Sequence, residues 1–188
     1  MTMTAKWSDK TILKFGRQID RLNKEFPKVI PQEINKVGNR AKTVVIRNLV
    51  KQTGLARAVI VKAVGDPTQA RPGKLSYEMQ TRGGNIRLKY LKPKESGGGV
   101  VAKPFGKTTY YPGAFMMGGA IGARKVVPKF KGHVMFRNRS SGRHYTFARS
   151  GVFIPVEMMR GQTLAAFNKI AVPLLEQRVQ KVIAKLLK

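Results

Sequence analysis

The spacing of apolar residues changes twice along this chain, and this change limits the possible folds more than any other feature. Apolar side chains recur every three or four positions in residues 8–64, alternate with polar ones in residues 74–155, and return to the first spacing in residues 160–188. The first pattern is typical of amphipathic helices and the second of half-buried strands. We therefore expect an α+β fold, in which an antiparallel β-sheet is flanked by N-terminal helices and a long C-terminal helix.

Proline residues are expected to interrupt both helical regions. Pro27 and Pro31 should separate a first helix, whose apolar face covers residues 12–26, from a second helix over residues 34–51. Proline lacks the N–H that an inner helical turn needs, and its ring clashes with the preceding turn. For the same reason, Pro173 should kink or divide the C-terminal helix.

Short runs in the middle of the chain are predicted to be strands, because they alternate in hydrophobicity and are separated by Gly, Pro and Ser clusters. In residues 85–91, apolar side chains alternate with Arg87 and Lys89, which predicts a strand with a basic outer face. Residues 55–64 fit either a short helix or a strand. No repeat or linker divides the chain, so we expect a single domain over residues 1–188. The strand runs are residues 74–80, 85–91, 98–103, 133–137 and 143–148.

The charge of the chain is strongly unbalanced. Its 188 residues include 37 Lys and Arg but only 9 Asp and Glu, which gives a formal net charge of +28 at pH 7. Such an excess of one sign is self-repelling, so the compact state should be most stable beside something anionic. The candidates are nucleic acid, an anionic membrane face and acidic partner proteins.

The composition also argues against several classes of protein. A membrane span is not expected, because no run of about 18 apolar residues occurs. Cysteine is absent, which removes disulfides, thiolate metal ligands and cysteine nucleophiles. The first residues, MTMTAKWSDK, lack the apolar centre of a signal peptide, so we expect the protein to stay in the cytosol where it is made.

The middle of the chain is entirely cationic. No acid occurs between Glu95 and Glu157, whereas ten Lys and Arg residues do. Over the whole chain, the charge is spread over helices, strands and loops, which favours sequence-independent contact with phosphate or acidic protein over the reading of bases. Four tyrosines could stack on bases, although packing in the core or in an interface is the preferred interpretation. They are Tyr90, Tyr110, Tyr111 and Tyr145.

No motif predicts an enzyme, a cofactor or a metal site. The run PFGKTT ends like a phosphate-binding loop, but the glycine required five positions before Gly106 is replaced by Val101, so we expect a turn. The run GGAIGARK, residues 118–125, is expected to be a flexible basic loop. His133 and His144 could face each other across a hairpin, but no carboxylate or cysteine is near them in sequence, so surface histidines are expected. The nine acids are scattered, without a convincing acid/base pair.

Several stretches resemble, in order and spacing, the minor tail protein Z family of long-tailed bacteriophages, which are tail-completion or neck proteins of the lambda type. INKVGNRAKTVVIRNLVKQTGL is similar to the family's N-terminal helix, and SGGGVVAK followed by YPGAFMMG to its strand and Gly-Ala-Phe segment. GHVMFRN is similar to the strand that follows, and VFIPVEMM to the segment leading into the closing helix. The resemblance covers residues 34–167.

This resemblance implies a non-enzymatic, structural virion protein that finishes the head-proximal end of the tail for head–tail joining and for positioning the genome end. It implies a homo-oligomeric ring, most naturally a hexamer, without membrane contact. The expected partners are the tail terminator or tail tube, the head-closure or connector proteins, and genomic DNA. The expected location is the virion tail or neck, with host cytoplasm during assembly. The alternative is a sequence-independent nucleic-acid-binding protein of an architectural or ribosomal kind.

Two groups of residues are the candidates for these contacts. A sheet interface is expected to use the Gly-Ala-Phe segment and a phenylalanine of the next strand, that is, Gly113, Ala114, Phe115 and Phe136. Contacts with DNA or an acidic partner are expected from the cations of the same region, that is, Arg124, Lys125, Lys129, Lys131, Arg137, Arg139 and Arg143.

Overall fold

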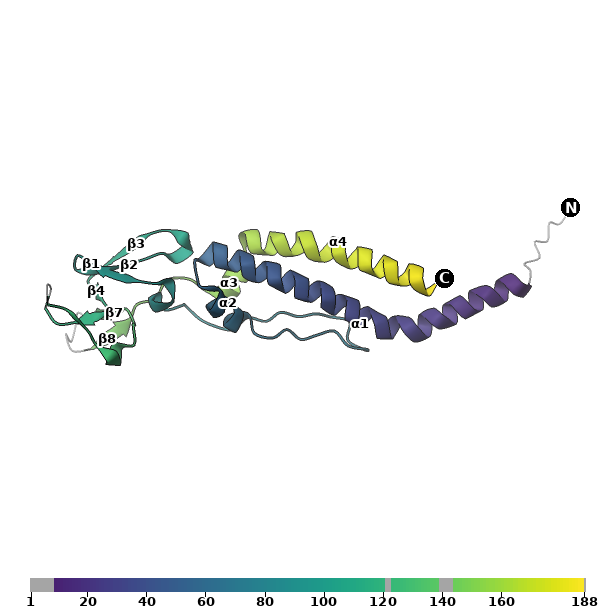
Figure 1. Cartoon of the computed structure of the whole chain (residues 1–188), viewed down its shortest axis with the longest axis horizontal. Coiled ribbons are helices and arrows are strands. Elements are labelled where there is room, and N and C mark those ends of the chain that lie inside the picture. The colour runs from purple at the N-terminus through teal and green to yellow at the C-terminus, as the bar shows by residue number, and fades with distance from the viewer. Residues whose placement is uncertain (1–8, 121–122, 139–143, 188) are drawn as a thin grey trace. The chain divides into compact units, whose positions relative to one another are not determined.

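The computed structural model of the chain describes residues 9–120, 123–138 and 144–187 (Figure 1). Within these ranges it has antiparallel sheets and long helices near both ends of the sequence, which confirms the predicted α+β class. The α-helices are α1 (Asp9–Thr53), α2 (Arg57–Val64), α3 (Ile154–Met158) and α4 (Gly161–Leu186). The strands are β1 (Lys94–Ser96), β2 (Gly99–Ala102), β3 (Thr109–Pro112), β4 (Ala114–Phe115), β5 (Met117–Gly118), β6 (Lys125–Val126), β7 (Met135–Arg137) and β8 (Tyr145–Phe147).

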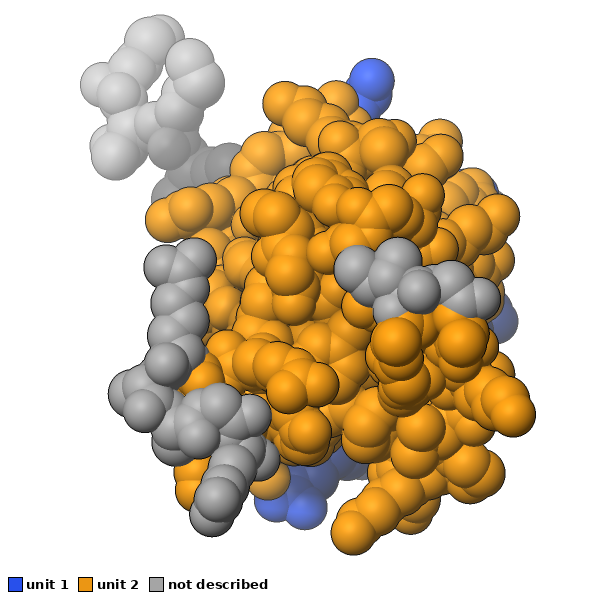
Figure 2. Space-filling model, turned by 90° about the vertical axis from the view of Figure 1, so that its left-hand side faces the viewer, with its two compact units in different colours: residues 1–42, 67–78, 168–188 blue, residues 43–66, 79–167 orange. Residues whose placement is uncertain are grey.

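The chain forms two compact units, drawn in blue and orange in Figure 2. Unit 1 comprises Met1–Lys42, Pro67–Glu78 and Asn168–Lys188, and unit 2 comprises Thr43–Asp66 and Met79–Phe167. The helices α1 and α4 each contribute residues to both units. The expectation of one domain stays a prediction, because compactness alone does not show whether each unit folds independently.

α1 continues through both of its prolines, so the predicted break between two helices is wrong. Pro27 and Pro31 lie inside the helix, each removing one backbone hydrogen bond. Most helix stability in proteins comes from packing rather than from any single hydrogen bond. Here Ile30 and Val37 are buried in unit 1 and provide that packing. α4 likewise continues through Pro173.

In unit 1, hydrogen bonds from α1 hold residues 67–78 in place. Asn35 makes two bonds with the backbone of Ala70, since its Nδ2 donates to the carbonyl (2.9 Å) and its Oδ1 accepts from the amide (2.7 Å). The Tyr77 hydroxyl donates to Oδ1 of Asn39 (2.9 Å). The segment is therefore held both by side chains of the helix and by its own backbone bridges, Thr68 with Glu78 and Arg71 with Lys74.

Two of the predicted strands are absent. Residues 74–80 contribute only to isolated bridges, and residues 85–91 end in a 3₁₀ turn, Leu88–Leu91. Leu88 and Leu91 are both buried, and a spacing of three places them on the same side of a helical turn but on opposite sides of a strand. The other three runs contain β2, β7 and β8 as predicted, and residues 55–64 contain the helix α2.

The carboxylate of Glu33 joins α1 to α4 within unit 1. Its Oε2 accepts from Nη1 of Arg178 (2.8 Å), and its Oε1 accepts from Nζ of Lys36 (2.6 Å). The hydrogen bond from Lys36 is the largest cause that lowers the pKa of Glu33; burial opposes it, and Arg178 lowers the pKa further. The charged form of Glu33 is thus favoured by folding.

Because folding lowers this pKa, Glu33 should stabilise the protein at neutral pH, and this stabilisation should be lost as the pH falls below about 5. We expect Glu33→Gln to lower the free energy of unfolding by about 1.5 kcal/mol at pH 7 and by much less at pH 3. Glu25→Gln is the matched control, since Glu25 pairs with Lys28 on the surface and should change stability by less than about 0.5 kcal/mol. Urea unfolding at both pH values measures the difference, and equal losses at both values would contradict the assignment.

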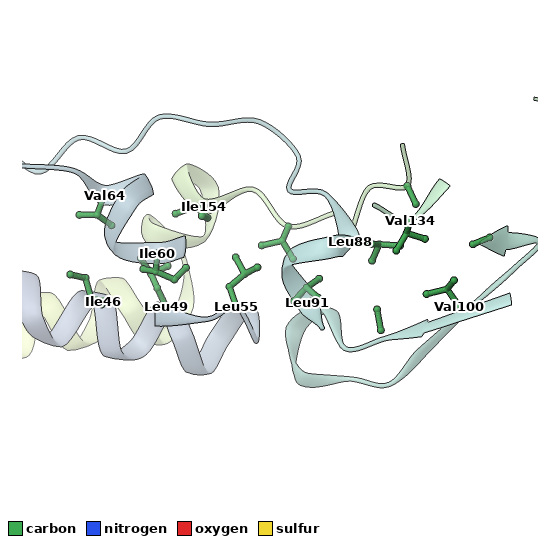
Figure 3. Close-up of a cluster of buried hydrophobic side chains, with 14 of the residues drawn as sticks. Ile46, Leu49, Leu55, Ile60, Val64, Leu88, Leu91, Val100, Val134 and Ile154 are labelled. Atoms are coloured by element: carbon green, nitrogen blue, oxygen red, sulfur yellow. The ribbon is translucent and has the colours of Figure 1, made fainter. Parts of the chain in front are cut away.

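The core of unit 2 is formed by the end of α1, by α2 and by two three-stranded antiparallel sheets, in the orders β1–β2–β3 and β4–β7–β8. Figure 3 shows its buried side chains, which come from segments far apart in the sequence. In the described part of the chain, no helix is both long and apolar enough to cross a membrane. Central members of the core are Leu49, Leu55, Ile60, Leu88, Val100, Val134 and Ile154.

Candidate anion-binding surface

The sheet β4–β7–β8 has one face on the core and one face outward. β7 pairs antiparallel with both neighbours, which places Phe115 opposite Met135, and Met135 opposite Phe147. Opposed residues share a face of the sheet, and so do alternate residues of one strand. Phe115, Met135, Arg137, Tyr145 and Phe147 therefore lie on the same face, which we call the outward face; of these residues, Met135 is buried.

Burial of the other face fixes which side is outward. Ala114, Val134 and Ala148 are at most 2% exposed, and Phe136 packs against the same core. A slip of one residue in the pairing would exchange the two faces of a strand and bring these side chains into water. Burial of these side chains therefore fixes the register of the sheet, so the rings and cations of the outward face point away from the core.

Three aromatic rings gather at one end of the outward face. Tyr145 makes edge-to-face contacts with Phe115 (5.3 Å between centroids) and Phe130 (6.4 Å). The guanidinium of Arg137 lies 5.9 Å from the centroids of both Phe115 and Tyr145, within the range of a cation–π interaction. Tyr145 nevertheless keeps 47% of its surface exposed, so the cluster is open to a partner.

A second group lies around Phe147, which is 44% exposed. The guanidinium of Arg87 lies 4.1 Å from the ring centroid, and the His133 ring lies 4.8 Å from it. Arg87 reaches this place because its segment adds to the sheet beside β8, with a bridge between Arg87 and Arg149. Nζ of Lys89 lies 3.5 Å from Nε2 of His133. Each of the two aromatic groups on the outward face thus has cations beside it.

The surroundings of His133 favour the neutral form of its imidazole, first through burial and then through nearby positive charges. Burial lowers the pKa of His133, and the positive charges of Lys89, Arg87 and Lys131 lower it further. A cationic imidazole would add to an already positive surface without an acid to balance it. Among the described residues, no three His, Cys, Asp or Glu side chains are close enough to hold a metal ion.

The predicted interface residues are divided between the two faces of this sheet. Gly113 is exposed at a positive φ of 71°, in the turn that leads into β4. Ala114 and Phe136 lie on the core side, and Phe115 lies on the outward face. Phe115 is thus the one of these four whose side chain joins the aromatic cluster.

The predicted anion contacts are in four different settings. Arg137 belongs to the outward face, and Lys131 is exposed beside His133 in the sequence. Lys125 on β6 and Lys129 in a 3₁₀ turn are also exposed. Arg124 is already paired within the protein, since its Nη1 forms an ion pair with the carboxylate of Glu95. Arg139 and Arg143 lie outside the described residues.

The carboxylate of Glu95 is committed to the fold. Besides its ion pair with Arg124, its Oε2 accepts hydrogen bonds from the backbone amides of Met116 (2.8 Å) and Met117 (2.9 Å). Its side chain is 5% exposed. Glu95 therefore does not neutralise the cations of the outward face.

Hollows occur in the described part of unit 2. One of about 230 Å³ adjoins the aromatic cluster and is lined by Phe115, Phe130, Arg137 and Tyr145, together with glycines. A larger one of about 730 Å³ has an apolar lining that includes Leu55 and Leu91, with three lysines also in its wall. The smaller hollow widens the part of the outward face that a partner can contact.

Sequence reasoning missed several members of this surface. Arg87 and Lys89 were identified as the basic side of a strand, but nothing in the sequence pattern joined them to residues 144–149. Phe130 and Phe147 were not singled out, because an isolated phenylalanine in a basic stretch gives no signal of exposure. No family model, no curated protein and no solved structure matches the chain. The similarity to the minor tail protein Z family therefore rests on the sequence stretches alone.

Proposed function

We propose that this chain is a structural, non-enzymatic virion protein of the neck of a long-tailed bacteriophage. There it completes the head-proximal end of the tail for head–tail joining and helps to position the genome end. The observation that carries the proposal is the outward face, which offers exposed rings, all from the acid-free segment between Glu95 and Glu157, with Arg137 of that segment and Arg87 beside them. Such a face is suited to binding an anionic partner.

The charge of the chain supports a role in an assembly. Each subunit carries +28, so a ring of six would carry about six times that charge and needs anionic neighbours to be stable. Acidic surfaces of the connector, head-closure or tail-terminator proteins and the DNA passing through the tail would supply the opposite charge. Complementary charge also speeds and orients association.

The second candidate is a sequence-independent nucleic-acid-binding protein that acts without a tail. It is favoured by the spread of exposed cations over elements outside the sheet, such as Lys51 on α1, Lys62 on α2 and Lys185 on α4. A phosphate backbone can be bound by cations in many arrangements, because its charge is the same along its length.

Sedimentation velocity at low and high salt, with and without a short DNA duplex, separates the two candidates. The neck protein is expected to form a ring-sized oligomer, or to remain a monomer that does not bind the duplex even at low salt, whereas the second candidate should form a salt-sensitive complex of one monomer with the duplex. The measurement would contradict the neck proposal if it showed one monomer bound tightly to duplex DNA and no larger species under any condition.

A further inference from the structure

We propose that the outward face of the sheet β4–β7–β8 is a binding site for single-stranded nucleic acid, in which Tyr145 and Phe147 each stack on one base. The site goes beyond the neck function, because it requires only the folded monomer. It is carried by three observations, namely the positions of the two rings, the cations beside them and the lack of any acid in the sequence between Glu95 and Glu157.

The two rings have the separation that an extended single strand needs. Tyr145 and Phe147 are alternate residues of β8, so their Cα atoms are about 7 Å apart on one face. Bases stacked in a duplex are only about 3.4 Å apart along each strand. Two bases can therefore occupy both rings only if the strand is unstacked and extended, which a single strand permits and a duplex does not.

Each ring has a guanidinium beside it. Arg87 lies over Phe147 at 4.1 Å, and Arg137 lies 5.9 Å from Tyr145. A guanidinium that packs against a ring by its flat face keeps N–H donors along its edge, and these donors suit phosphate oxygens. A ring with a guanidinium beside it can contact both parts of a nucleotide, the base through the ring and the phosphate through the guanidinium.

An acidic protein would use the cations but not the rings. The exposed fractions of Tyr145 and Phe147, 47% and 44%, leave aromatic surface in water beside positive charge. Carboxylates would bind the guanidinium groups and leave these rings without a partner, whereas bases cover them. Stacking of a base on an aromatic ring does not depend on which base it is. It therefore suits a surface that has no acid side chain to accept hydrogen bonds from particular bases.

The direct test is fluorescence anisotropy of the full chain with oligothymidine of roughly 12 nucleotides, within the site sizes known for single-strand-binding folds. A duplex of the same length is measured in parallel, at several salt concentrations. We expect the single strand to bind more tightly than the duplex. Duplex binding that equals or exceeds single-strand binding would overturn the proposal.

Variants separate stacking from charge. Tyr145→Leu and Phe147→Leu should each weaken single-strand binding about 5- to 100-fold and leave its salt dependence unchanged. Arg87→Gln and Arg137→Gln should each reduce the slope of log affinity against log salt by about 0.7. Phe147→Trp should retain binding, because tryptophan can also stack on a base. If Phe147 only supported the fold, there would be no reason to expect this rescue. If the leucine variants, folded by circular dichroism, bind like the unchanged protein, the proposal is wrong.

The matched charge control is Lys62→Gln combined with Lys103→Gln, since both lysines are exposed in unit 2 and neither belongs to the sheet β4–β7–β8. This double variant removes the same positive charge as the double variant Arg87→Gln with Arg137→Gln. We expect the control to lose much less affinity for the single strand than the arginine pair loses. Equal losses would show that binding follows total charge and would contradict the proposal. If polyglutamate displaces the strand and the leucine variants bind polyglutamate as the unchanged protein does, the partner of the outward face is an acidic protein instead.

Discussion

Replacing Gly54 with alanine should lower the free energy of unfolding by about 3 kcal/mol, which is a large part of the stability of a domain of this size. Gly54 follows the last residue of α1, and its amide donates to the carbonyl of Val50 (3.0 Å). Its φ of +74° lies in the left-handed region, where a side chain adds strain. The chain turns here from α1 into the core residue Leu55, so the strain cannot be relieved by fraying.

The larger part of the cost comes from a close backbone approach. A Cβ atom on Gly54 would lie 2.8 Å from the carbonyl oxygen of Lys103 and 3.1 Å from the amide nitrogen of Gly106. Both are backbone atoms of unit 2 and cannot rotate away as a flexible side chain can. Overpacking of this kind costs about 1–3 kcal/mol in addition to the strain.

Gly151→Ala is the matched control for this variant. Gly151 has a nearly equal φ of +78°, but a Cβ atom there would meet nothing within 4 Å. We therefore expect a loss of only about 1 kcal/mol, from conformational strain alone. Urea unfolding, followed by far-ultraviolet circular dichroism, measures the free energy of unfolding of both variants. Equal losses for Gly54→Ala and Gly151→Ala would contradict the close contact between residues 103–106 and the end of α1.

Gly38→Ala is expected to destabilise unit 1 by about 2 kcal/mol, although alanine is the better helix former. A Cβ atom on Gly38 would lie 2.3–2.5 Å from ring atoms of Tyr77, so the ring must leave its place. It would take with it the hydrogen bond from its hydroxyl to Asn39. The loss of this packing and of the hydrogen bond exceeds the gain in helix propensity of about 1 kcal/mol.

The position of the tyrosine ring can be followed separately from stability. Burial raises the pKa of the Tyr77 phenol, so displacement of the ring should bring that pKa back toward its usual value, as measured by NMR titration. Gly16→Ala is the control in the same helix, because its Cβ atom would meet nothing, and it should stabilise α1 by about 1 kcal/mol. If Gly38→Ala raised the free energy of unfolding and left the pKa of Tyr77 unchanged, residues 67–78 could not pack on α1 as described.

The fold class could be predicted because hydrophobic periodicity reports which side of an element is buried. β7 and β8 were predicted on this basis, although burial does not alternate along them: Met135 is the buried residue of β7, and all three residues of β8 are exposed. The same logic failed at residues 85–91, where Leu88 and Leu91 are buried at a spacing of three in a 3₁₀ turn. It failed again at Pro27 and Pro31, because a local rule about proline does not include the packing that holds a long helix together.

The candidate site could be predicted only in part, because its members meet through long-range pairing. The acid-free segment directed attention to Arg137, and alternation marked Arg87 as exposed, but only the bridge to Arg149 brings Arg87 to Phe147. Arg124 shows the opposite case. It is one of the predicted contacts, yet it is paired with Glu95, and no sequence pattern reveals an ion pair between residues 29 positions apart.

Binding of an anionic partner at the outward face of the sheet β4–β7–β8 can be localised by hydrogen–deuterium exchange of the full chain, with and without single-stranded oligothymidine. Protection on binding should be confined to residues 85–89, 131–137 and 144–149. Protection on the basic sides of α1, α2 or α4, with these three segments unchanged, would contradict it.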